Sequence, residues 1–183
     1  MRYLTKEWYL AGQTWPVAAD VQARLDETSR AFREARARED LPPELMRDFS
    51  FHDGVIQEIH VGEDLTFSID SPFSGYHTVI FRHARVKQAL PPAGAFWLYE
   101  ELYRHKSGTG YEAHILLEAP TRSGRRRLQL ADLFDLKLIC SEICFCLVCL
   151  RVCFLGARGS EAVGGGARRR IFGRGDRRQA RQP

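Results

Sequence analysis

The stretch VIQEIHVGEDLTFSID, residues 55–70, decides the fold class, because its side chains alternate with a period of two. In its first half this alternation places Val55, Gln57, Ile59 and Val61 on one face, and in its second half Leu65, Phe67 and Ile69. The tripeptide Gly62-Glu63-Asp64 between the halves has the composition of a turn. Such alternation is typical of strands with one face on a core and the other in water. The stretch therefore predicts an antiparallel hairpin.

Upstream of the hairpin the period changes to that of a helix. Thr5 is placed to cap a short first helix, and Pro16 suits the first position of a longer one, where its missing N–H costs nothing. Apolar residues then recur three to four positions apart, or at twice that spacing, at Val17, Val21, Leu25, Phe32 and Ala35. Leu41-Pro42-Pro43 ends the pattern, because the residue before a proline avoids the helical region. Residues 1–50 are predicted to be helical.

Downstream of the hairpin the pattern predicts further strands. They run from Tyr76 to about Lys87, from Tyr111 to Glu118, and from Arg126 to about Ile139. The aromatic run Phe96–Tyr103 is compatible with either a helix or a strand. Helices followed by a meander of strands indicate the α+β class. We predict one domain over residues 1–155, with an antiparallel sheet of about five strands over residues 51–142.

The last 28 residues differ in composition from the rest of the chain. The formal net charge is +4, but residues 156–183 contain eight Arg, one Glu and one Asp, a net of +6, so the rest carries −2. The hydrophobic fraction of 44% and the charged fraction of 27% are those of a globular protein. We predict a disordered Arg/Gly-rich tail over residues 156–183, which offers phosphate contacts as its only route to nucleic acid.

All five cysteines, Cys140, Cys144, Cys146, Cys149 and Cys153, lie just before this change of composition. Thiolate zinc sites usually pair two knuckles across a loop, and only Cys146 and Cys149 have knuckle spacing. A thiol metal site is therefore the weaker interpretation. The stronger ones are a buried apolar segment around the cysteines and a shifted reading frame after about Cys140, which would explain a frameshifted tail.

Four stretches resemble, in order and spacing, a bacterial family designated domain of unknown function 4085. They are MRYLTKEWY at residues 1–9, FHDG at 51–54, WLYEE at 97–101 and YEAHILL at 111–117. The resemblance covers about residues 1–140 and implies a bacterial protein, but it carries over no functional residue. Beyond residue 140 the chain departs from the acidic and apolar ending expected of the family.

No membrane segment is expected. The first residues lack the apolar stretch of a secretory signal, and the longest apolar run, Ile143–Leu150, is far shorter than the roughly 20 residues of a membrane helix. We therefore expect a cytoplasmic protein with reduced cysteines.

Two classes of function remain open. The chain contains no P-loop, dinucleotide fingerprint, Gly-x-Ser-x-Gly elbow or HExxH, so no cofactor is predicted and an enzyme is the less favoured class. The preferred interpretation is a non-enzymatic module that binds a partner, with a protein as the candidate, through a surface at Trp97, Tyr99, Glu101 and Tyr103. The alternative is a hydrolase-like enzyme that uses His52, Asp53, Glu101 and His114.

Overall fold

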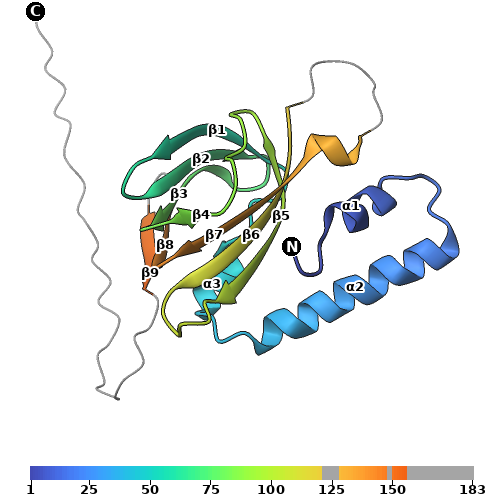
Figure 1. Ribbon diagram of the computed structural model, residues 1–183, viewed down its shortest axis with the longest axis horizontal. Coiled ribbons are helices and arrows are strands. Elements are labelled where there is room, and N and C mark those ends of the chain that lie inside the picture. The colour runs from blue at the N-terminus through green and yellow to red at the C-terminus, as the bar shows by residue number, and fades with distance from the viewer. Residues whose placement is uncertain (121–127, 148–149, 156–183) are drawn as a thin grey trace, which may run out of the picture.

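The fold consists of three helices on one large antiparallel sheet, shown in Figure 1 as a computed structural model. The structure describes residues 1–120, 128–147 and 150–155. Within these ranges the elements are α1 Lys6–Gly12, α2 Ala19–Arg38, α3 Pro43–Asp48, β1 Gly54–Val61, β2 Leu65–Ser71, β3 Gly75–Arg82, β4 Arg85–Val86, β5 Phe96–Arg104, β6 Tyr111–Glu118, the 3-10 helix η1 Leu130–Asp132, β7 Leu133–Cys140, β8 Glu142–Leu147 and β9 Leu150–Leu155. The α+β class is confirmed, but the sheet has nine strands in the described residues instead of about five.

The predicted hairpin is β1 and β2, joined at the expected turn. Leu65, Phe67 and Ile69 are buried, as the alternation requires. In β1 the register shifts between Ile56 and Glu58, because a bulge inserts one extra residue into the strand. Ile56, before the shift, therefore shares the face of Ile59 and is fully buried. Val61 pairs with Leu65 on that same face, at the end of the hairpin, and is 72% exposed. Strict alternation placed Val61, and not Ile56, on the apolar face.

The sheet closes on itself. Its order is β4-β7-β6-β5-β1-β2-β3-β8-β9. After a short break β4 continues the line of β3, and β8 continues that of β7. Arg82 pairs with Glu142 and Arg85 with Ile139, so the register of β3 against β8 continues as that of β4 against β7. The pairings therefore form a ring from β1 through β2, β3–β4, β7–β8, β6 and β5 back to β1. Figure 1 shows the strands curling around a common interior, which the main apolar core fills.

A break at His83 divides the strand that was predicted from Tyr76 to about Lys87. His83 has a φ of 49°, a left-handed conformation that a non-glycine residue keeps only when its surroundings hold it there. Asp64 in the β1–β2 turn holds this break, because its carboxylate accepts the His83 N–H at 3.1 Å and pairs with Arg82. Ser141 interrupts the partner strand opposite and donates its N–H to the Arg82 carbonyl at 3.0 Å.

The C-terminal strands also differ from the prediction. Where one strand was expected from Arg126 to about Ile139, η1 precedes a strand that begins only at Leu133; residues 121–127 lie outside the described part. The cysteine segment adds β8 and β9 to the sheet, with Ile143, Cys144 and Phe145 buried. The buried apolar segment is thus confirmed for β8. Cys149 and the predicted tail, residues 156–183, lie outside the described residues.

The N-terminal segment, residues 1–5, lies between the sheet and α2. Residues Met1 and Leu4 join a second apolar cluster with Leu98, Leu116 and Leu133 on the outer face of β5, β6 and β7. No residue of α2 is buried, and the helix touches this segment through its Phe32 ring, 6.0 Å from Tyr3. The N-terminal segment therefore connects α2 to the sheet.

The cap of α1 and the end of α2 follow the prediction, whereas the expected start of the long helix at Pro16 is wrong. Thr5 caps α1 by accepting the Trp8 N–H at 3.2 Å, as expected. The long helix begins at Ala19, three residues after Pro16, and ends at Arg38, before the Leu41-Pro42-Pro43 stretch. Among the described residues, no helix is both long and apolar enough to cross a membrane.

Candidate functional site

The four side chains predicted to form a binding surface do not share an exposed face. Trp97 is fully buried inside the closed sheet, where its ring packs against three phenylalanines, Phe49, Phe51 and Phe67. A register shift after Trp97 places Tyr99, Glu101 and Tyr103 on the outer face of β5. There Glu101 and Tyr103 are buried beneath the N-terminal segment, and Tyr99 is half-buried against the ring of Trp8.

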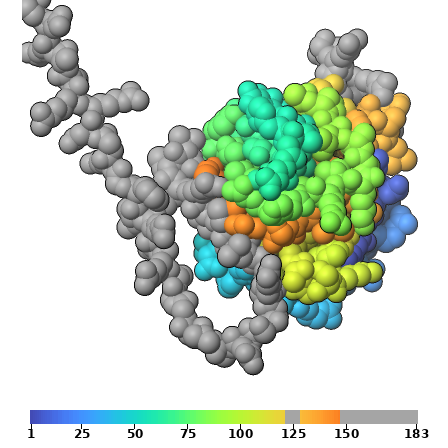
Figure 2. All heavy atoms as spheres, turned by 60° about the vertical axis from the view of Figure 1, so that its left-hand side comes forward, coloured from blue at the N-terminus to red at the C-terminus, as the bar shows by residue number. Residues whose placement is uncertain are grey.

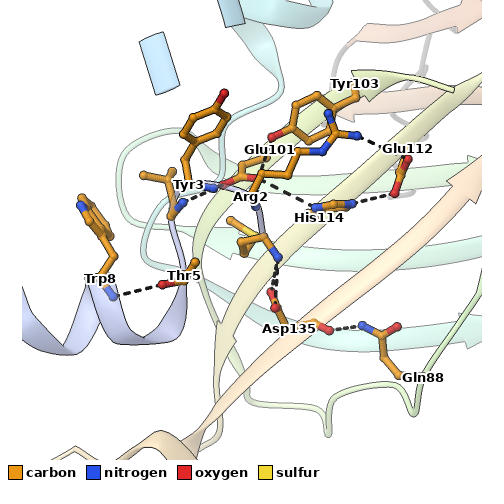
Figure 3. Close-up of polar contacts among 12 residues, drawn as sticks. Arg2, Tyr3, Thr5, Trp8, Gln88, Glu101, Tyr103, Glu112, His114 and Asp135 are labelled. Carbon is orange, nitrogen blue, oxygen red and sulfur yellow. Dashed lines mark hydrogen bonds and ion pairs between the residues drawn. The ribbon is translucent and has the colours of Figure 1, made fainter. Parts of the chain in front are cut away.

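Glu101 binds the beginning of the chain (Figure 3). Its Oε1 accepts the N–H groups of Tyr3 at 2.8 Å and Leu4 at 2.7 Å. Its Oε2 accepts the Arg2 N–H at 2.6 Å and the Tyr103 hydroxyl at 2.7 Å. A carboxylate offers about four lone-pair positions. The chain's own donors therefore use the acceptor capacity of Glu101.

Further polar contacts surround this carboxylate. His114 Nε2 lies 2.8 Å from Glu112 Oε1, and His114 Nδ1 lies 3.8 Å from Glu101 Oε2. Arg2 lies over the Tyr103 ring, 3.7 Å from its centroid, and 3.8 Å from Glu112. These contacts bring residues of β5, β6 and the N-terminal segment together, as Figure 3 shows.

The α-ammonium of Met1 is also paired. It donates to both carboxylate oxygens of Asp135 in β7, at 3.0 Å and 3.1 Å. Three neighbouring strands, β5, β6 and β7, thus each supply an acidic residue that faces the N-terminal segment.

Burial and hydrogen bonding set the charge of each group in this cluster. Burial alone would raise the pKa of Glu101, but the donors from Arg2 and Leu4, together with Tyr103 and Tyr3, outweigh it and hold the pKa below its usual value. Burial lowers the pKa of His114 despite its bond to Glu112, so the imidazole is neutral, and we assign its proton to Nε2. The His114 Nδ1 lone pair then faces Glu101, which explains why this atom has no hydrogen-bond partner among the described residues.

The cluster is thus an anchor of fixed charge. Burial and the bond to Glu101 raise the pKa of Tyr103 far above neutrality. The carboxylate, the neutral imidazole and the phenol all keep their protonation state near pH 7, and Glu101 has no acceptor position left for a substrate. Its geometry favours holding the N-terminal segment over acid–base chemistry.

His52 and Asp53 form a separate pair beside Tyr99. His52 Nδ1 bonds the Leu98 carbonyl, the ring lies 4.8 Å from that of Tyr99, and Nε2 is 3.6 Å from Asp53. Asp53 has a φ of 59° and leads directly into β1, as expected of a turn residue before glycine. Within the described residues no hydrogen bond or ion pair joins this pair to Glu101 and His114. The structure thus brings the four residues of the hydrolase hypothesis together as two pairs.

Glu100 points to the opposite face from Glu101. It is almost fully buried and accepts the Trp97 Nε1–H at 2.8 Å. Burial raises its pKa, against hydrogen bonds from Trp97 and Ser50 that act in the other direction. Glu100 belongs to the interior of the sheet.

The described thiols are packed side chains. Cys140 and Cys144 are buried, Cys144 Sγ donates to Glu142 Oε1 at 3.2 Å, and burial raises the pKa of Cys140 to about 12. A thiol this hard to ionise is a poor metal ligand and nucleophile. In the described residues no group of three or more His, Cys, Asp or Glu side chains is placed to hold a metal ion.

A cleft lies where the closed sheet is interrupted. It has a volume of about 460 Å³, and its lining residues are His83, Arg85, His105, Ser107, Thr109, Ile139, Cys140 and Ser141. They come from the break after β3, the loop between β5 and β6, and the junction of β7 with β8. In Figure 2 the orange residues of β7 and β8 reach the surface between a green and a yellow segment.

Glycines and hydroxyl groups shape the cleft. A Cβ on Gly110, which has a φ of 77°, would lie 2.2 Å from the Cys140 carbonyl oxygen, so only glycine allows this approach of the loop. His105 Nδ1 lies 2.8 Å from Ser107 Oγ, and Ser107 Oγ lies 3.0 Å from Thr109 Oγ1. In the same lining His83 Nδ1 lies 2.9 Å from Ser141 Oγ.

Sequence reasoning missed this cleft. The lining residues other than His83 and Arg85 lie at least 20 positions away from these two in the sequence. The stretch Ser107-Gly108-Thr109-Gly110 was the available signal, because glycines that flank hydroxyl residues are typical of a tight polar loop.

Comparison with protein-family models, with curated proteins and with solved structures finds no match for this chain.

Proposed function

We propose that this protein is a non-enzymatic binding module, and that the cleft at the interrupted strands receives an anionic group of its ligand. The observation that carries the proposal is Arg85. This arginine lines the cleft and makes no ion pair within the described residues. A guanidinium presents five donors in a fixed plane that suits carboxylate and phosphate oxygens.

The remaining lining of the cleft supports the same ligand class. Two imidazoles and three hydroxyl groups line the same cleft as Arg85, and the hydroxyls of Ser107 and Ser141 donate to the carbonyls of Thr109 and Arg82. Two carboxylates contact His83. Asp64 accepts its N–H at 3.1 Å but is paired with Arg82, and Glu63 lies 3.5 Å from its Nε2 and is 84% exposed. Solvent screens a carboxylate in that position, so the cleft retains a cationic character.

A second hollow, of about 480 Å³, is less suited to an anionic group. Its lining residues are Leu10, Gln13, Leu128 and Gln129, and none of them is charged. The hydrolase alternative with His52, Asp53, Glu101 and His114 is less supported than binding, because Glu101 already accepts four hydrogen bonds from the chain itself.

The test is chemical-shift mapping of the full chain with two small probes, acetate and inorganic phosphate, against chloride at equal ionic strength. We expect the amide signals of Arg85, Thr109 and Ser141 to move with at least one probe, while those of α2 stay in place. Cleft signals that move with neither probe would contradict the proposal.

A further inference from the structure

We infer that Cys144 and Cys153 form a reversible disulfide, with a small-molecule disulfide as the oxidant, and that this bond fastens β9 to β8. The two residues are directly opposed register partners in the antiparallel pair β8–β9. Cys140 lines the cleft described above, whereas Cys144 does not. The inference is therefore independent of the proposed binding function.

The register places the two cysteines at the separation that a disulfide needs. Directly opposed residues of antiparallel strands have Cα atoms about 4.5 Å apart in a non-hydrogen-bonded pair and about 5.5 Å apart in a hydrogen-bonded pair. Disulfides join residues whose Cα atoms are about 4.4–6.8 Å apart. Either type of pair therefore meets the requirement without movement of the backbone.

Two other cysteines of the described part are less well placed to bond Cys153. Cys146 lies opposite Arg151 and is thus diagonal to Cys153, and diagonal neighbours are about 7–8 Å apart, beyond the reach of a disulfide. Cys140 belongs to the main core inside the closed sheet, as does Phe145. Because consecutive residues of a strand face opposite sides, Cys144 lies on the outer face, which its register partner shares.

The Cys144 sulfur has polar neighbours that suit both of its ionisation states. As a thiol it donates to Glu142 Oε1 at 3.2 Å. The bond to Asp64 and, after it, the contact with the Cys144 thiol raise the pKa of the Arg82 guanidinium. A guanidinium beside a sulfur favours the thiolate, which is the attacking species in disulfide exchange. Cys144 therefore has a partner before and after it loses its proton.

The oxidation is a thiol–disulfide exchange in two steps. One cysteine thiolate attacks a sulfur of the small disulfide, whose S–S bond breaks and releases one small thiolate. The second cysteine thiolate then attacks the bonded cysteine sulfur and releases the other small thiolate. The protein gives up two protons and two electrons, and the small disulfide becomes two thiols. Because Cys144 is fully buried, a bulky adduct on its sulfur is hindered and the second, intramolecular step is favoured.

The bond would secure an edge of the sheet. β9 is the last strand in the sheet order and pairs with β8 alone among the described strands. Edge strands carry unpaired backbone groups, and the least stable parts of a fold open locally. A covalent link between β8 and β9 opposes that opening, so the redox state of the pair would control how often the outer edge of β8 is exposed.

The first experiment oxidises the full chain with glutathione disulfide, blocks the remaining thiols and digests the protein with trypsin. Cleavage after Lys137, Arg151 and Arg158 yields peptide 138–151, with four cysteines, and peptide 152–158, with Cys153 alone. We expect mass spectrometry to find the two peptides joined by a bond that dithiothreitol breaks. Peptides that stay separate, or a chain that becomes a dimer on a non-reducing gel, would overturn the inference.

Two matched alanine variants identify the partner of Cys153. Cys144→Ala should abolish the joined peptides, whereas Cys146→Ala, which removes a thiol from the same face of β8, should leave their yield unchanged. Joined peptides in the Cys144→Ala protein, or their loss in the Cys146→Ala protein, would each assign the bond to another cysteine and overturn the pairing.

Amide hydrogen exchange of the unaltered chain measures the fastening itself. We expect oxidation to slow exchange in β9 at least about ten-fold relative to the reduced chain, because the bond opposes local opening. Exchange in α2 should be the same in both forms. Equal rates in β9 before and after oxidation would show that the bond does not hold the edge.

Discussion

Glu100 and Glu101 are adjacent in β5, yet their surroundings shift their pKa values in opposite directions. Glu101 faces the N-terminal segment with four donors, whereas Glu100 faces the interior with Trp97. The strand places consecutive side chains on opposite faces. Two identical residues therefore stabilise the protein over different ranges of pH.

For Glu101→Gln we expect a free energy of unfolding lower by about 3 kcal/mol at pH 7, because an amide cannot accept all four bonds and buried donors lose their charged partner. The folded-state pKa of Glu101 lies below the unfolded value, so its contribution is complete above the unfolded pKa and is lost as pH falls through the folded pKa. The difference from the parent should shrink in acid. Urea denaturation from pH 3 to pH 7 measures this difference, with the exposed Glu58→Gln as the control. Equal losses of stability in the two variants would contradict the role of Glu101 in holding the N-terminal segment.

Glu100→Gln should behave in the opposite way. The folded-state pKa of Glu100 lies above the unfolded value, so its protonated form stabilises the protein below the unfolded pKa, and this contribution is lost as pH rises through the folded pKa. An amide does not ionise, and the stability of the variant relative to the parent should increase between pH 4 and pH 7. The same urea series measures this, and a parallel pair of pH profiles would exclude a raised pKa.

The fate of individual residues shows what the sequence could predict. The sequence named Glu101 and His114 as candidates, and the structure brings them together. It did not reveal that the backbone N–H groups of Arg2, Tyr3 and Leu4 bind the Glu101 carboxylate, because the pattern of side chains carries no information about backbone donors. Trp97 was placed on a surface because aromatic residues suit interfaces and cores alike, and only the closure of the sheet around it decides between the two.

At the scale of elements, the loop between β5 and β6 depends on two glycines with nearly the same backbone conformation. Gly108 has a φ of 76° and Gly110 a φ of 77°. A Cβ on Gly108 would meet nothing within 4 Å, whereas a Cβ on Gly110 would lie 2.2 Å from the Cys140 carbonyl oxygen. The pair separates the cost of the backbone conformation from that of the contact.

We expect Gly108→Ala to lower the free energy of unfolding by about 1–2 kcal/mol, the usual cost of a left-handed conformation. Gly110→Ala should cost clearly more, because the loop must also move away from the β7–β8 junction. Thermal and urea denaturation of the two variants give the comparison. Equal costs would show that the loop does not pack against Cys140 as described.

Elements with long regular patterns were the most predictable. The hairpin β1–β2, the cap of α1 and strand β6 follow from local sequence. The bulge after Ile56 and the break at His83 do not, because each depends on a distant partner: β2 for the bulge, and Asp64 with Ser141 for the break. The cleft exists because of that break, which is why the sequence did not predict it.

At the scale of the whole molecule, β7 and β8 are the segment that completes the ring of strands. Without them β3 and β6 would each lack a partner along one edge. Unpaired edges expose rows of backbone donors and acceptors that pair with other chains.

We therefore expect a chain that ends at residue 132 to aggregate, and one that ends at residue 155 to remain dispersed and folded. The shorter form lacks β7, β8 and β9, whereas the longer form lacks only the arginine-rich residues 156–183. Size-exclusion chromatography with light scattering separates the two outcomes. A dispersed, folded chain of 132 residues would contradict closure through β7 and β8.

The closed sheet also has a consequence for synthesis. A ribosome adds about 5–20 residues per second, and the strands that complete the ring follow β1 to β6 along the chain. Strands β1 to β6 must therefore wait, with the edges of β3 and β6 open, until residues 133–147 have emerged. The nascent chain is most vulnerable to misassembly in that interval. A chaperone that covers strand edges would benefit this protein at that stage. A change of reading frame near residue 140 would alter the segment that completes the ring of strands.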